Sequence, residues 1–351
     1  MKFIKSGITS AALIMSLSLC AFIPAGAREN KQQPPPPKSE GQKQDKGQKP
    51  APEEGPQEDE PIKLGAALVT VPFNVTDKQN RYINELGKSD VELLEDNKPQ
   101  QIFSFERQTD LPITIAMLID ISGSQEFTLP SEVTAGKSFF TQVLRPKKDL
   151  AAVVTFENES VLVQNLTSDI EKLYRALDSV RISVQTPSVG PVGGTPPINP
   201  RGAGSTAMYD SIYSVSSDLL KHEAGRRVII LVTDGQDTSS QVKLREAIEV
   251  TWRNEIIVYA IGIGDQFYGV DSGVLKKVAA ETGGRAFFPR SDSDLAKAYA
   301  LIDEDLRSQY IASYGSSNEA KDGSFRTIQV KVKNRKELTV RHRRGYFASK
   351  R

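Results

Sequence analysis

Cysteine is nearly absent from this 351-residue sequence, which contains only Cys20. Cys20 lies in an apolar N-terminal stretch that we expect to be removed, so the mature chain would carry no thiol. Disulfides, zinc-thiolate sites and a cysteine nucleophile are thereby excluded. The folded chain must therefore be stabilised by packing rather than by cross-links.

Histidine and the common nucleotide-binding motifs are also scarce. His222 and His342 are the two histidines, and their sequence positions assign neither to a catalytic site. No phosphate-binding loop of the Gly-x-x-x-x-Gly-Lys-Ser/Thr type occurs, and Gly262-Ile263-Gly264-Asp265 lacks the further glycines of a dinucleotide site. We therefore expect a protein that is not an enzyme, with a metal-assisted hydrolase as the less favoured alternative.

The sequence has no excess of charge of either sign. Its formal net charge of +1 falls to −1 once Lys2 and Lys5 leave with the N-terminal stretch. No global field therefore favours nucleic acid as a partner. Hydrophobic residues make up 38% of the chain, which is enough for a core, and the length suits two domains.

The N-terminal 60 residues predict export. In residues 1–27, two lysines precede an apolar run from Ile8 to Ile23, and Ala25-Gly26-Ala27 forms a small-residue cleavage site. The run is too short and interrupted for a membrane anchor, and Leu19 does not suit lipid attachment at Cys20. Residues 28–60, rich in Gln, Lys, Pro and Glu, predict a disordered linker. We expect a secreted, periplasmic or cell-surface protein with no transmembrane segment in the mature chain.

Short β-like runs occupy both flanks of the remaining sequence. Residues 61–110 contain three of them, with a tight turn predicted at Asp96-Asn97-Lys98-Pro99, and residues 308–351 contain three more. Each flank is too short to bury a core alone, so we expect the two to pair as one small β-sandwich. The intervening domain would then be an insertion into this sandwich.

Residues 111–307 predict a doubly wound, mostly parallel α/β domain. Continuous apolar runs, such as Ile113 to Ile119 and Val228 to Val232, alternate with helical patterns. The Pro- and Gly-rich segment from Arg181 to Gly204 breaks this rhythm and predicts a long loop, whose role the sequence leaves open.

Oxygen-bearing side chains follow the first strand of this domain. Asp120, Ser122 and Ser124 come at alternate positions just past its carboxyl end, where doubly wound sheets bind ligands. Hard oxygen ligands suit Mg²⁺. Taken alone, however, the pattern also fits an ordinary helix N-cap.

Two further segments favour the metal interpretation. Thr206 opens a helix, and Asp234 follows the next core strand, so both are expected at the same sheet edge. Thr195 also lies in a glycine-rich segment, but two prolines follow it and no helix begins until residue 206. We therefore prefer Thr206.

At these residues the chain resembles the von Willebrand factor A-type (VWA) domain, a Rossmann-like fold. The family's metal-ion-dependent adhesion site (MIDAS) consists of Asp-x-Ser-x-Ser, a Thr and an Asp in this order. The resemblance implies that Mg²⁺ or Mn²⁺ is held by Asp120, Ser122, Ser124, Thr206 and Asp234. The flanks, including Arg344-Gly345-Tyr346-Phe347, resemble a bacterial subfamily of VWFA-related proteins common in Acidobacteria.

The family uses the metal to capture a carboxylate of a partner protein. The resemblance thus implies a metal-dependent adhesion or interaction module whose partner offers an Asp or Glu side chain. The alternative class is attachment to an anionic surface through the basic C-terminal strands, whose cations are Lys331, Lys333, Arg335, Lys336, Arg341, Arg343, Arg344, Lys350 and Arg351. The oligomeric state and the partner's identity are left open by the sequence.

Overall fold

The computed structural model describes residues 68–183, 205–264 and 269–350. The predicted signal peptide, the predicted linker, Thr195 and most of the predicted 181–204 loop lie outside these residues. No helix in the described part of the chain is long and apolar enough to cross a membrane.

A six-stranded sheet forms the centre of the α/β domain, in the order β10-β9-β8-β5-β6-β7. All neighbours are parallel except β6 and β7. The inner strands β5 and β9 are buried along their whole length and β8 at every residue except Arg227, as the continuous apolar runs require. The strands are β5 (Ile113–Asp120), β6 (Leu150–Phe156), β7 (Ser160–Thr167), β8 (Arg226–Thr233), β9 (Ile256–Gly262) and β10 (Ala286–Phe287).

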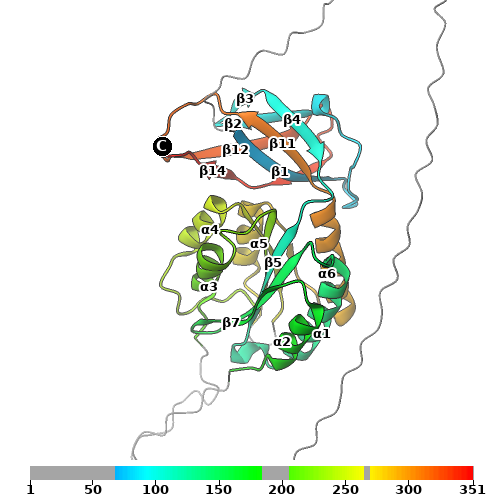
Figure 1. Ribbon diagram of the computed structural model, residues 1–351, viewed down its shortest axis with the longest axis vertical. Coiled ribbons are helices and arrows are strands. Elements are labelled where there is room, and N and C mark those ends of the chain that lie inside the picture. The colour runs from blue at the N-terminus through cyan, green and yellow to red at the C-terminus, as the bar shows by residue number, and fades with distance from the viewer. Residues whose placement is uncertain (1–67, 184–204, 265–268, 351) are drawn as a thin grey trace, which may run out of the picture. The chain divides into compact units, whose positions relative to one another are not determined.

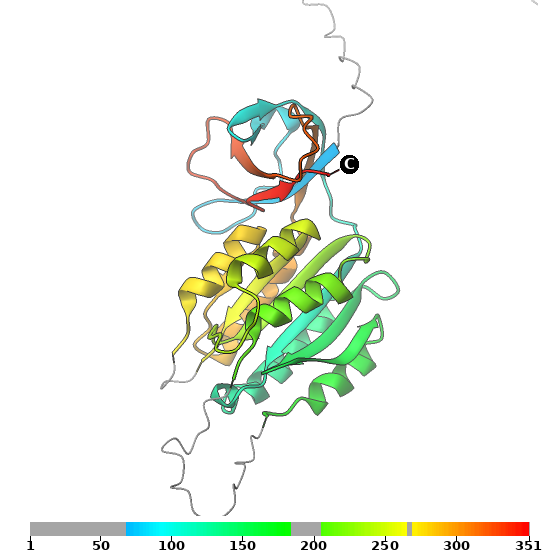
Figure 2. The same ribbon diagram turned by 90° about the vertical axis from the view of Figure 1, so that its left-hand side faces the viewer.

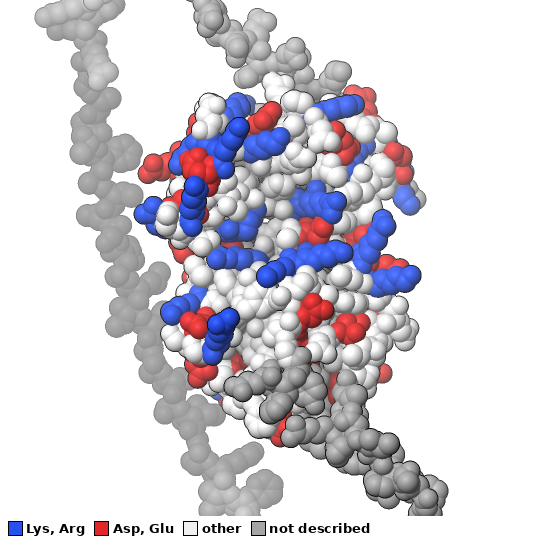
Figure 3. Space-filling view, turned by 180° about the vertical axis from the view of Figure 1, so that it is seen from behind, with Lys and Arg blue, Asp and Glu red and all other residues white. Residues whose placement is uncertain are grey.

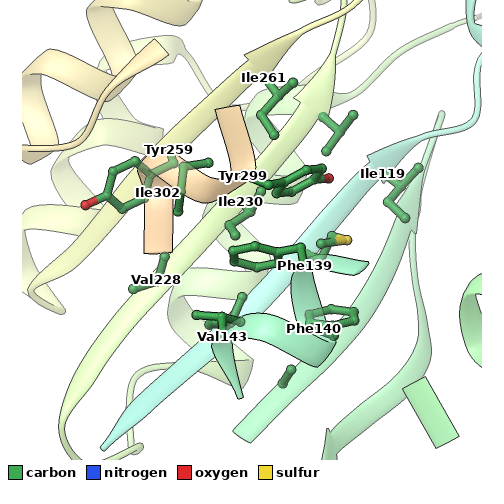
Figure 4. Close-up of a cluster of buried hydrophobic side chains, with 14 of the residues drawn as sticks. Ile119, Phe139, Phe140, Val143, Val228, Ile230, Tyr259, Ile261, Tyr299 and Ile302 are labelled. Carbon is green, nitrogen blue, oxygen red and sulfur yellow. The ribbon is translucent and has the colours of Figure 1, made fainter. Parts of the chain in front are cut away.

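Helices cover both faces of this sheet (Figures 1 and 2). One apolar cluster joins the sheet to α1 (Leu129–Val143), α2 (Ile170–Ser179) and α6 (Asp292–Arg307). In Figure 4, Phe139 of α1 and Tyr299 of α6 lie together on that face. A second cluster joins the other face to α3 (Met208–Ser214), its π-helical continuation η3 (Val215–Leu219), α4 (Leu244–Arg253) and α5 (Ser272–Thr282). The predicted doubly wound, mostly parallel fold is confirmed.

Two four-stranded antiparallel sheets share a third apolar core. One has the order β13-β1-β11-β4 and the other β14-β12-β2-β3, so each combines strands from both chain ends. Their strands are β1 (Leu68–Thr76), β2 (Val91–Glu95), β3 (Lys98–Gln100), β4 (Ile102–Arg107), β11 (Tyr310–Gly315), β12 (Phe325–Val332), β13 (Thr339–His342) and β14 (Gly345–Phe347), with a short 3-10 turn at Lys88–Asp90. The predicted pairing of the two flanks is confirmed.

The hairpin turn in this sandwich is shorter than the sequence suggested. Asp96 and Asn97 adopt φ values of 47° and 64°, the left-handed pair of a two-residue hairpin. Strand β3 therefore already begins at Lys98, and Pro99 lies within it.

Polar contacts fasten the α/β domain to the sandwich at the amino ends of the parallel strands. Asp305 near the end of α6 accepts hydrogen bonds at Oδ1 from Asn74 Nδ2 (2.6 Å), Tyr82 Oη (2.6 Å) and Arg341 Nη2 (3.0 Å). The buried Arg226 guanidinium, at the start of β8, donates to the carbonyl oxygens of Gln108 and Leu306. The carboxyl ends of the strands lie at the opposite edge of the sheet, away from these junctions.

Candidate metal site

Asp120 is the last residue of β5 and is fully buried. Its Oδ1 accepts a hydrogen bond from the backbone nitrogen of Ser122 at 2.9 Å. Its Oδ2 accepts one from Thr233 Oγ1, on the neighbouring strand β8, at 2.6 Å. The carboxylate is therefore held from two elements, which fixes its orientation.

Ser122 and Ser124 follow at the 3-10 turn η2 (Gly123–Gln125). Their hydroxyl oxygens lie 3.0 Å apart. Neither serves as the N-cap that the sequence left open, because Ser122 makes no side-chain capping bond to η2 and Thr128 occupies the N-cap position of α1. Neither hydroxyl is therefore used in helix capping, and both lie beside Asp120.

Hydrogen bonds to two loops hold Thr206 at the same edge. It is buried, and its backbone nitrogen donates to Thr238 Oγ1 at 2.8 Å. The next residue, Ala207, donates its backbone N–H to the carbonyl oxygen of Glu157 at 2.6 Å. Glu157 follows Phe156, the residue of β6 that pairs with Asp120 in the sheet.

Asp234 follows β8 directly and is also buried. Its Oδ1 accepts a hydrogen bond from the backbone nitrogen of Gln236 at 2.9 Å. Burial, together with a smaller contribution from the charge of Asp234, raises the pKa of Asp120 to about 6. Two buried carboxylates thus repel each other here, and no Lys or Arg of the described residues forms an ion pair with Asp120.

The donor set fits a hard divalent cation. Two carboxylates and three hydroxyls supply oxygen ligands of low total charge, which Mg²⁺ and Mn²⁺ accept. Within residues 68–183, 205–264 and 269–350, no three His, Cys, Asp or Glu side chains group to hold a metal. A cation at this edge would therefore be held largely by hydroxyls and water. The assignment of the five residues as ligands stays a prediction.

Two buried polar residues behind Ser124 were not found from the sequence. Gln125 is fully buried, and Glu132 on α1 is 2% exposed. Burial, with smaller contributions from the charges of Asp120 and Asp234, raises the pKa of the Glu132 carboxyl to about 8. The available signal was the position of Glu132 between Leu129 and Gly136 on the buried face of α1, where an acid is costly.

An open groove of about 970 Å³ lies beside this edge. Phe127, three residues after Ser124, forms part of its wall. The Phe127 side chain is 72% exposed. Apolar side chains complete the wall: Ile263 after β9, Val270 before α5, Phe288 after β10 and Leu295 in α6. Arg290 at its rim is exposed and adds a positive charge. No sequence pattern indicated the groove, because its walls come from segments far apart in the chain.

Three of the basic C-terminal residues form ion pairs with acids of the α/β domain. Arg341 pairs with Asp305, Arg343 Nη1 lies 2.9 Å from Glu255 Oε1, and Arg344 Nη1 lies 2.7 Å from Glu281 Oε1. On the face drawn in Figure 3, acidic and basic side chains are interspersed. Three of the nine cations proposed for surface attachment therefore serve internal contacts.

The histidines lie away from the metal edge. His342, in β13, accepts a hydrogen bond at Nε2 from the backbone nitrogen of Val330 at 3.2 Å. Burial lowers the pKa of this imidazole. His222 is exposed after the third helix.

Residues 196–300 match the sequence profile of the von Willebrand factor type A domain. This match supports the resemblance to the VWA domain over residues 196–300, the segment that contains Thr206 and Asp234. The bacterial VWFA-related subfamily stays a prediction. No curated protein matches the chain.

Several solved structures are similar to the chain. Proximal thread matrix protein 1 from the mussel byssus has a TM-score of 0.46 and 19% identity, covering 61% of this chain and 51% of that one. The chain thus spans about half the length of the mussel protein, for which another structure is described with a zinc-occupied MIDAS motif.

Two bacterial structures are also similar. BatB from Bacteroides thetaiotaomicron has a TM-score of 0.42 and 18% identity, covering 57% of this chain and 100% of that one. A von Willebrand factor type A protein from Catenulispora acidiphila has a TM-score of 0.45 and 14% identity, covering 81% and 74%.

Proposed function

We propose that this protein is an exported, non-enzymatic interaction module that captures an acidic side chain of a partner protein through a bound Mg²⁺ ion. The observation that carries the proposal is the buried, prearranged set of oxygen donors at one sheet edge. Asp120 is oriented by Thr233, and the Ser122 and Ser124 hydroxyls lie beside it. When bound, the cation supplies a positive centre with an open coordination position for a carboxylate oxygen.

The residues of the chain have distinct parts in this proposal. Ser122 and Ser124 hold the ion directly, Thr206 directly or through water, and Asp120 and Asp234 mainly through water. Because the directly bound donors are neutral, the ion keeps most of its charge for an incoming acid. The groove that starts at Phe127 supports a protein partner, because an apolar surface next to the ion can bury side chains flanking that acid.

Calorimetric titration with Mg²⁺ tests the metal site. We expect binding to the wild type and loss of it in Asp120→Ala and in the double variant Ser122→Ala/Ser124→Ala. Asp178→Ala is the control, since Asp178 is an exposed acid on α2 paired with Lys137. Equal heats from the wild type and from folded Asp120→Ala and double-variant proteins would refute the proposal.

A pull-down from the native surroundings tests the interaction. A protein retained with Mg²⁺ and released by EDTA supports metal-dependent capture. Retention that ignores EDTA but falls steeply with salt would instead support attachment through exposed cations such as Lys331, Lys333 and Lys336.

A further inference from the structure

When a serine hydroxyl binds a cation, its hydrogen must point away from the ion, toward a hydrogen-bond acceptor. The oxygen gives a lone pair to the ion, so its O–H needs a separate acceptor. Ser124 Oγ has two described polar neighbours: Ser122 Oγ at 3.0 Å and a terminal atom of the Gln125 side-chain amide at 3.4 Å. Ser122 has the same need, because it is expected to bind the ion as well. The Gln125 side-chain amide is therefore the group that can accept a hydrogen bond from the Ser124 hydroxyl.

The surroundings of Gln125 decide which end of its amide faces Ser124. On the far side lie three acceptors, at distances that the amide nitrogen satisfies: Thr128 Oγ1 at 3.1 Å, Glu132 Oε1 at 3.3 Å and the carbonyl oxygen of Ile263 at 3.3 Å. Thr128 also donates its own proton to the carbonyl oxygen of Gln125 at 3.2 Å, which leaves its oxygen free to accept. With the nitrogen on that side, the amide oxygen faces Ser124.

Glu132 is placed to fix this orientation. Its Oε1 accepts from the amide, whereas its Oε2 has no hydrogen-bond partner among the described residues. An acid buried in this way costs stability, and the same helix face otherwise carries apolar residues. Tyr299, whose hydroxyl also lacks a described partner, packs on Phe139 of the same helix (Figure 4). Packing alone would favour an apolar residue at position 132.

We infer that Gln125 and Glu132 are positioning residues that direct the Ser124 proton away from the cation site and so present the lone pairs of Ser124 to the ion. This inference rests on the proposed metal site. In the chain Ser124 to Gln125 to Glu132, the Ser124 O–H donates to the Gln125 amide oxygen and the Gln125 N–H donates to Glu132 Oε1. Neither positioning residue touches the ion.

Mg²⁺ titration of full-chain variants tests the inference. Gln125→Met and Glu132→Met keep side-chain volume and remove the polar atoms, and we expect Mg²⁺ affinity to fall about 10- to 100-fold in each. Glu132→Gln retains an acceptor oxygen, so its affinity should stay within roughly threefold of the wild type. The double Met variant should be no weaker than the weaker single variant, because both changes break one chain.

Gln309→Met is the matched control, since Gln309 is a buried glutamine of the chain remote from the metal edge. Its Mg²⁺ affinity should equal that of the wild type, while thermal unfolding confirms that each variant is folded. Wild-type affinity in folded Gln125→Met, or equal losses in Glu132→Gln and Glu132→Met, would overturn the inference. If Gln125→Met fails to fold, the two Glu132 variants decide. Absence of Mg²⁺ binding by the wild type would instead refute the proposed metal site itself.

Discussion

Thr233 Oγ1 donates a 2.6 Å hydrogen bond to Asp120 Oδ2, joining the ends of two neighbouring parallel strands. The same hydroxyl oxygen accepts from the backbone nitrogen of Gly235 at 3.1 Å. Thr233 therefore couples the orientation of the Asp120 carboxylate to the loop that carries Asp234. It lies one position before a predicted ligand and is fully buried.

Thr233→Val should weaken Mg²⁺ binding without unfolding the protein. Valine keeps the shape but removes the donor, so Asp120 loses one of its two orienting bonds, and we expect affinity to fall about tenfold. Calorimetry measures this. Thr251→Val is the control, because Thr251 is a fully buried threonine that donates within helix α4 to Ile248. Equal losses in the two variants would show that the effect is not specific to Asp120.

Glu95→Ala should destabilise the sandwich severely. The buried Glu95 carboxylate accepts from Tyr314 Oη at 2.7 Å, Ser316 Oγ at 2.6 Å and Tyr346 Oη at 2.9 Å, and it faces the buried Arg326 guanidinium at 3.4 Å. Removing it leaves a buried cation unpaired, which costs about 3–5 kcal/mol.

Urea denaturation measures the free energy of unfolding for this comparison. Glu95→Gln, which keeps an acceptor oxygen, should lose less than Glu95→Ala. Glu106→Ala, at an exposed position of β4, should change the free energy of unfolding by no more than about 0.5 kcal/mol. A Glu95→Ala loss as small as that of Glu106→Ala would contradict the role given to Glu95.

The sequence predicted the parts of the fold that depend on strong periodicity. The inner strands are apolar on both faces because helices cover both, and that pattern is visible in the chain. Strand β7 was missed because it is an edge strand without a buried residue, and its pairing with β6 is irregular, with bulges. The short strands β10 and β14 contain too few residues for a pattern to emerge.

Candidate site residues were predictable where they end a strand or follow one directly. Asp120 ends β5 and Asp234 follows β8, and parallel strands bring their carboxyl ends to one edge. Gln125 and Glu132 act through tertiary contacts with Ile263 and with each other, which no local pattern records. The same reason applies to the groove, whose walls meet only in the folded chain.

Phe127→Ala should weaken partner binding and leave Mg²⁺ affinity unchanged. Phe127 is 72% exposed at the groove beside the metal edge, so it is free to pack against side chains next to the captured acid. The measurement is the amount of EDTA-releasable protein retained in the pull-down. Phe103→Ala is the control, because Phe103 is 54% exposed on the sandwich strand β4. Equal retention by both variants would remove the groove from the interface.

The buried Glu132 carboxyl should make the free energy of unfolding depend on pH. Burial raises the pKa of its carboxyl to about 8 from an ordinary value near 4.5, so the folded state holds a proton that the unfolded chain releases. Its contribution to stability is therefore fully present below about pH 4.5 and is lost as the pH rises through 8. Glu132→Gln cannot release this proton, so the variant should escape the loss.

The two proteins should be compared by denaturation in EDTA from pH 5 to about 8.5. Other titrating groups, such as His342, largely cancel in the difference between wild type and variant. We expect the wild type to lose on the order of a few kcal/mol relative to Glu132→Gln across this range. A difference that is constant with pH, or one in which the wild type gains, would mean that Glu132 is not held protonated beside the metal site in the folded chain.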